Sequence, residues 1–130
     1  MAPVPRLLAF LICQKARIDK RQVTLEQITD VLDADSVPFT AQLTFFIRCV
    51  ASDPPPQLVV EMFQVSVPVA MTHRVISFEP DERGPLRSVV YKAVLTFPSF
   101  GEYQFRLSVG DATLAVTPLA VRSRGRSNRA

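Results

Sequence analysis

The side chains that could act as nucleophiles, bases or metal ligands are few and widely separated. His73 is the only histidine, and both cysteines, Cys13 and Cys49, lie in apolar stretches. Cysteine–histidine catalysis needs the thiol within reach of the imidazole and a third group that orients it, and an apolar environment disfavours the thiolate. A zinc site needs cysteine and histidine ligands at short spacing. The sequence therefore predicts neither site, and we expect His73 at the surface.

Carboxylates and glycines do not form a recognisable site either. Asp30, Asp33 and Asp35 lie close together, as do Asp81 and Glu82. Such groups could serve as acid/base pairs or calcium ligands, but we interpret them as solvated turn residues. The four glycines are scattered, which excludes a phosphate-binding loop. We expect a protein without enzymatic activity, metal or cofactor.

The elements that would hold a binding surface are β-strands, because apolar residues recur at every second position. Turns rich in proline, glycine and aspartate separate these rows, a pattern typical of an all-β sandwich. Pro118 interrupts the last row and predicts a bulge or an edge position there. The predicted inward rows are Leu8, Phe10, Ile12, Ala16 and Ile18; Leu43, Phe45, Ile47, Cys49 and Ala51; Val59, Phe63, Val65 and Val67, with Glu61 breaking the row; Val89, Tyr91, Ala93, Leu95 and Phe97; Tyr103, Phe105, Leu107 and Val109; and Leu114, Val116, Leu119 and Val121.

The stretch 24–32 has two interpretations. Thr24 and Gln27 fit the capping pattern at the start of a helix. Several residues of the stretch are β-branched, which favours a strand. We favour the strand and leave the helix open.

Length and composition indicate one domain. The chain has 130 residues, of which 48% are hydrophobic and 21% charged. A chain of this length and composition can bury a core that is stable without a metal ion or a disulfide. We assign the domain to residues 1–122 and interpret the basic residues 123–130 as a disordered tail. Without that tail the net charge of +3 falls close to zero, so charge does not indicate a nucleic-acid partner.

The apolar run at residues 7–13 does not indicate a membrane protein. It is far too short to span a bilayer, and no small residues typical of a signal-peptide cleavage site follow it. We therefore expect a cytoplasmic protein without membrane contact. In that compartment both cysteines would be reduced core residues.

The segment 97–109 is the most informative part of the sequence. Pro98 and Gly101 bend the chain after one strand, and Tyr103 opens the next. This arrangement resembles the tyrosine corner of immunoglobulin-like sandwiches, in which the hydroxyl bonds to backbone a few residues upstream. The other pieces that carry a resemblance are residues 10–13, 19–20, 23–25, Phe105, Gly110-Asp111, Pro118-Leu119 and Val121.

Over about residues 7–122 the chain resembles a family of uncharacterised bacterial domains with an immunoglobulin-like fold. The resemblance implies an all-β, immunoglobulin-like two-sheet antiparallel sandwich of about seven to eight strands. It brings no activity or ligand with it. The chain has no tryptophan and no cysteine beside the corner strand, which argues against an antibody-like extracellular domain.

Three features could bind a partner. Phe46 and Val50 lie on the other side of their strand from its inward row, so either the fold covers them or they offer a hydrophobic patch. Phe100 lies in the corner loop, where it either anchors a contact or packs over the end of the sandwich. The third feature is the arginine tail, which could contact an anionic surface or simply aid solubility. Its members are Arg122, Arg124, Arg126 and Arg129.

From these features we expect a non-enzymatic module for protein–protein interaction, or a structural or accessory subunit, with a homo-oligomer as one form. One alternative is a carbohydrate-binding sandwich, although the chain has no tryptophan and only two tyrosines on which sugars could stack. Another is weak nucleic-acid binding through the arginine tail.

Overall fold

A computed structural model describes residues 4–19, 22–50, 56–78 and 85–124. Within these residues the chain forms nine strands, because alternating apolar side chains suit a surface that is buried on one side. They are β1 (Arg6–Asp19), β2 (Gln22–Ile28), β3 (Val31–Ala34), β4 (Phe39–Val50), β5 (Leu58–Gln64), β6 (Thr72–Ile76), β7 (Leu86–Phe97), β8 (Gly101–Val109) and β9 (Ala112–Ser123).

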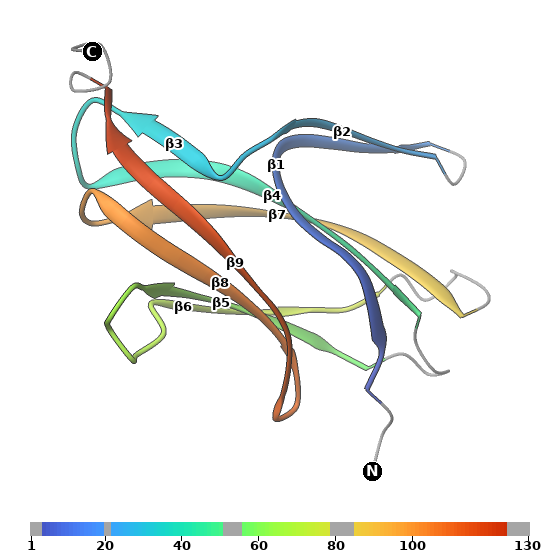
Figure 1. Ribbon diagram of the computed structural model, residues 1–130. Coiled ribbons are helices and arrows are strands. Elements are labelled where there is room, and N and C mark those ends of the chain that lie inside the picture. Colours follow the sequence, from blue (N-terminus) through green and yellow to red (C-terminus); the bar gives the residue numbers. More distant parts are fainter. Residues whose placement is uncertain (1–3, 20–21, 51–55, 79–84, 125–130) are drawn as a thin grey trace.

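The strands form two sheets that pack face to face (Figure 1). The first sheet has the order β2-β1-β4-β7, with every neighbouring pair antiparallel. The second has the order β3-β9-β8-β5-β6, antiparallel except that β3 runs parallel to β9. The predicted all-β sandwich is confirmed. The described part of the chain has nine strands instead of seven to eight, because the chain crosses between the sheets after β2 and adds β3 beside β9.

The strand order is immunoglobulin-like. In that fold strands B and E are neighbours in one sheet, and strands C, F and G lie side by side in the other. Here β4 and β7 take the places of B and E, and β5, β8 and β9 take those of C, F and G. Tyr103 lies near the start of β8, the F position.

The core lies between the sheets and is centred on aromatic side chains. Phe45 of β4 stacks on Phe10 of β1 at a ring-centroid distance of 6.0 Å and meets the edge of Phe105 of β8 at 5.2 Å. Phe97 and Tyr103 form a second edge contact at 5.0 Å. Burial of each large apolar side chain contributes about 1.5–3 kcal/mol, so these contacts hold the two sheets together.

Two predicted rows on β1 and β5 differ from the structure. A register shift between Leu7 and Ala9 turns Leu8 toward solvent, and Leu7 packs against the core in its place. On β5 the buried side chains are the even-numbered ones, from Leu58 to Met62. A one-residue change of register moves a whole row to the other face of a sheet, so Glu61 lies on the outer face and does not interrupt the core.

The stretch 24–32 forms parts of two strands joined by a bend. Strand β2 pairs with β1 up to Ile28, and β3 begins at Val31. Between them the Thr29 hydroxyl donates to the carbonyl of Val31 at 2.7 Å. This side-chain bond supports the bend, so the strand interpretation is confirmed and the helical one is wrong.

Two features of β8 and β9 follow the prediction. Gly110, with φ of +55°, and Asp111 form the two-residue connection between the strands. Pro118 pairs with Gln104 at a point in β9 that precedes the residues paired with β3. It therefore occupies an edge position, where its missing N–H is tolerated. The register shift lies earlier in β9, and Val116 consequently faces solvent.

Candidate binding groove on the second sheet

An open groove of about 620 Å³ lies on the outer face of the second sheet. Its floor comes from β5, β8 and β9, and one wall is the start of the loop that connects β5 to β6. Ligand pockets commonly have volumes of roughly 300–1,000 Å³. The residues that line the groove are Phe63, Gln64, Val65, Ser66, Val67, Pro68, Gln104, Arg106 and Val116.

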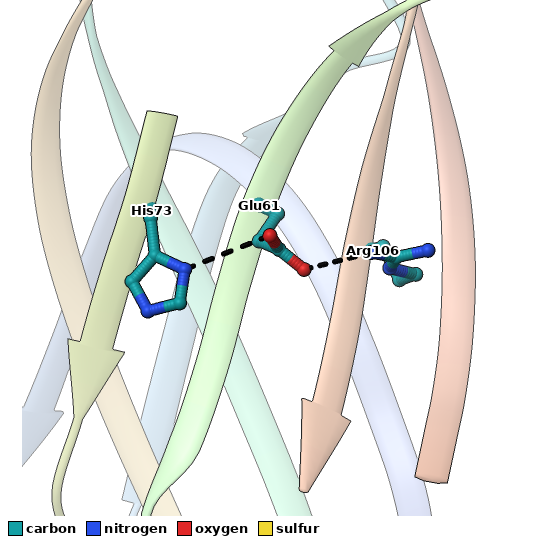
Figure 2. Close-up of polar contacts among 3 residues, drawn as sticks. All are labelled: Glu61, His73 and Arg106. Carbon is teal, nitrogen blue, oxygen red and sulfur yellow. Dashed lines mark hydrogen bonds and ion pairs between the residues drawn. The ribbon is translucent and has the colours of Figure 1, made fainter. Parts of the chain in front are cut away.

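A row of three charged or titratable side chains crosses the sheet beside this groove (Figure 2). Glu61 on β5 is paired in register with His73 on β6 and with Arg106 on β8. An Nη atom of Arg106 donates to Oε1 of Glu61 at 2.9 Å, and Nδ1 of His73 lies 3.6 Å from Oε2. The hydrogen bond from Arg106 lowers the pKa of Glu61, with a smaller contribution from His73. Glu61 is therefore ionised at neutral pH.

Arg106 is held in a fixed orientation. Its guanidinium carbon lies 4.5 Å from the centre of the Phe63 ring, the neighbouring outward side chain on β5. Stacking on an aromatic face and a carboxylate bond both restrict a guanidinium. The side chain is still 41% exposed, so it presents donors to the groove from a preorganised position.

The loop from residue 65 to 71 is apolar and exposed. Val65, Val67, Val69 and Met71 are all exposed, and Val69 reaches 70%. Backbone bonds hold both ends of the loop: the amide of Val65 donates to the carbonyl of Glu102, and that of Met71 to Met62. Single exposed apolar residues are ordinary, but a continuous exposed run indicates an interaction surface. We call this segment the valine loop.

The turn between β7 and β8 lies beside the start of the valine loop (Figure 1). The buried Tyr103 hydroxyl donates to the Ser99 carbonyl at 2.6 Å and accepts from the Ser99 amide at 3.1 Å. The Gln64 amide group donates to Oγ of Ser99 at 2.9 Å. Phe100 in the same turn is 38% exposed. These bonds fix the turn and leave Phe100 partly open to solvent.

Phe46 and Val50 lie on the outer face of the first sheet, away from the groove. Phe46 is only 5% exposed, and the guanidinium carbon of Arg48 lies 5.4 Å from the centre of the Phe46 ring. The Nε of Arg48 also donates a hydrogen bond to the Ser88 hydroxyl. Val50 is partly buried opposite Leu86. The fold itself covers Phe46, which is the first of the two alternatives that the sequence left open.

The described arginines of the tail lie at the end of β9. Ser123 still belongs to the strand, and Arg122 is exposed. Arg124 donates to the Asp33 carbonyl at 3.3 Å and lies 3.5 Å from a carboxylate oxygen of Asp35. Residues 126 and 129 fall outside the described residues.

The two cysteines are buried and unbonded to each other. Cys13 is paired in register with Thr44 on β4, so these two side chains share one face of the sheet. Cys49 lies five residues after Thr44, and successive side chains of a strand alternate between faces, so the two thiols lie on opposite faces. Burial raises the pKa of the Cys13 thiol. Within the described residues no group of three or more histidine, cysteine, aspartate or glutamate side chains could hold a metal ion. Nor does that part of the chain contain a helix long and apolar enough to cross a membrane.

None of the residues that line the groove belongs to a site that the sequence predicts. The alternation at residues 59–67 predicts one inward row, whereas Val65 and Val67 lie beyond the end of β5. The sequence places Arg106 at an outward position of its strand but Glu61 within a predicted inward row, so it does not indicate that the two side chains meet. Only the pairing of β5 with β8 brings them together.

Comparison with known proteins gives no family. No protein-family model and no curated protein sequence matches the chain. Among solved structures, an immunoglobulin-like protein from Pseudomonas aeruginosa is similar at 16% identity over 93% of this chain and 98% of its own, with a TM-score of 0.41. A β-glucosidase from Listeria innocua, solved in complex with glucose, is similar at 10% identity over 88% of this chain, with a TM-score of 0.45.

The present chain spans only 16% of the glucosidase's length. Both TM-scores lie below 0.5, so the assignment of the fold rests on the strand order.

Proposed function

We propose that this chain is a non-enzymatic immunoglobulin-like module that binds a protein partner through the groove and the adjoining valine loop. The observation that best supports this proposal is the exposed, apolar valine loop beside an open groove. The apolar core of the domain is otherwise well buried. Arginine is enriched at the energetically important positions of protein interfaces, and Arg106 lines this groove.

Phe100 is a further part of the proposed surface, because its turn is hydrogen-bonded to the start of the valine loop. We assign Tyr103 the role of a tyrosine corner that fixes this turn. This role is supported by the two hydrogen bonds between its hydroxyl and the Ser99 backbone. Loops and turns held by a rigid scaffold are common positions for binding residues.

The proposal includes membership in the family of bacterial immunoglobulin-like domains that the sequence resembles, and a cytoplasmic location. Two buried cysteines that form no disulfide with each other fit a reducing compartment. A carbohydrate-binding role has less support, since sugar sites stack their ligands on exposed aromatic rings. Among the described residues Phe100 is the only aromatic side chain with substantial exposure.

The experiment is site-specific photo-crosslinking in the native host. A benzoyl-phenylalanine at Val67 should yield one defined higher-mass product that contains a partner protein. The matched control carries the same group at Val94, an exposed valine on the outer face of the first sheet. Products of the same mass at both positions, or none at Val67, would contradict the proposal.

A further inference from the structure

The groove has a simple charge pattern. Arg106 is the one charged side chain in its lining, and the rest are apolar groups, two glutamines and a serine. The carboxylate of Glu61 neutralises Arg106 from the side but does not line the groove. A ligand that fills the groove therefore meets one cation among side chains that are otherwise uncharged.

The guanidinium retains donors for a second acceptor. Arginine has five N–H donors, and the bond to Glu61 occupies one terminal nitrogen. Because the ring of Phe63 supports one face of the group, its planar edge keeps its direction when a ligand arrives. Arginine in such a position recognises a carboxylate with good geometry.

We propose that the groove binds an extended acidic segment of the partner, in which an aspartate or glutamate side chain is flanked on both sides by aliphatic residues. The carboxylate bonds to Arg106, and the flanking side chains pack against Val65, Val67 and Val116. This inference rests on the proposed function and names the chemistry of its partner.

Other occupants match the groove less well. The valine loop of a second copy has no acidic residue, so its insertion would leave Arg106 without an added partner. Nucleic acid needs several cations along its backbone, and the described residues of the groove provide one within an otherwise uncharged lining.

The position of Glu61 yields an unusual expectation for mutants. Glu61 competes with the ligand carboxylate for Arg106, so Glu61→Gln should tighten binding about two- to fivefold, the range of a partly exposed charge interaction. Arg106→Gln should weaken binding about tenfold or more, because a charge-assisted hydrogen bond is lost. A purely structural role for the pair would make both variants bind less well.

The test is a titration of the full chain with three N-terminally capped nonapeptides, of which the first two are also capped at the C-terminus. Binding is monitored by NMR through the backbone amides of residues 63–67 and the Arg106 Nε–H. The first peptide has a central glutamate with two valines on each side. The second has glutamine in its place. The third keeps the glutamine but ends in a free carboxylate after the last valine.

We expect the glutamate peptide to bind about tenfold more tightly than the glutamine peptide, and Arg106→Gln to remove that difference. Arg17→Gln is the matched control, because Arg17 forms an exposed pair with Glu26 far from the groove, and it should bind like wild type. Urea unfolding verifies that each variant folds. If Arg106→Gln does not fold, Arg106→Lys should give an intermediate preference.

Equal affinity for the glutamate and glutamine peptides would overturn the inference, as would weaker binding by Glu61→Gln. If the third peptide binds more tightly than the other two, the groove recognises the carboxylate at the end of a chain instead of an acidic side chain. If light scattering shows that the wild-type chain is a dimer and that Arg106→Gln is a monomer, the occupant of the groove is a second copy of the chain. If crosslinking at Val67 succeeds while the glutamate preference is absent, only this inference fails and the interaction module stands.

Discussion

Removal of one oxygen atom from Tyr103 tests how the turn beside the valine loop is held. In the Tyr103→Phe variant the ring keeps its contact with Phe97, whose centre lies 5.0 Å away. The variant loses the 2.6 Å bond to the Ser99 carbonyl and the 3.1 Å bond from the Ser99 amide. Both backbone groups are then left without their partner in a partly buried turn.

An unsatisfied buried polar group costs about 1–3 kcal/mol, and we expect a loss near 2 kcal/mol. For a domain of this size each kcal/mol corresponds to about 3–5 °C in Tm, so Tm should fall by about 6–10 °C. Urea unfolding should show a lower midpoint with an unchanged slope, since the surface exposed on unfolding stays the same.

The control is Tyr91→Phe, because the Tyr91 hydroxyl has no hydrogen-bond partner in the part of the chain that the structure describes. It should change stability by less than about 0.5 kcal/mol. The reasoning is refuted if Tyr103→Phe is as stable as Tyr91→Phe.

Further predictions concern the core, the charged row and the thiols. Phe45→Ala removes the ring that joins the two sheets and should cost about 3–5 kcal/mol in urea unfolding; a loss below about 1 kcal/mol would contradict the described packing. The bond from Arg106 holds the pKa of Glu61 below its ordinary value of 4.5, so Glu61 stabilises the fold above that pH and loses this effect as pH falls through the folded-state pKa. Glu61→Gln should therefore be less stable than wild type at pH 7 and equal to it in acid; a difference that persists in acid would exclude this origin. Cys13 and Cys49 should react slowly with a thiol reagent in the folded protein and at once in denaturant, and one fast thiol in the folded protein would argue against their burial.

The fold could be predicted from the sequence largely because alternation survives where a strand is buried on one side. The row from Tyr103 to Leu107 and that from Val89 to Phe97 were assigned correctly, with Tyr91 only partly buried. Prediction was less successful at β5. There apolar residues occupy both faces, so alternation does not decide between the row of Val60 and the row of Phe63.

The candidate site was largely missed for a different physical reason. The groove forms where β5, β8 and β9 lie side by side, and strand pairing across the sequence is set by the whole sandwich. Glu61 and Arg106 are 45 residues apart, and neither has a local neighbour that reveals the pair. The turn that carries Phe100 could be predicted because it is local, with Tyr103 only a few residues away.

The parallel pairing of β3 with β9 has a consequence for the order of folding. Residues near position 32 meet residues near position 121, so this contact closes almost the longest loop in the described chain. Closure of long loops is entropically costly and slow. During synthesis β8 therefore has an open edge until the chain to residue 123 has left the ribosome, and β3 has no strand to join before then. The second sheet is therefore complete only when β9 has paired with both β8 and β3, and until then the edge of β8 can pair with another chain.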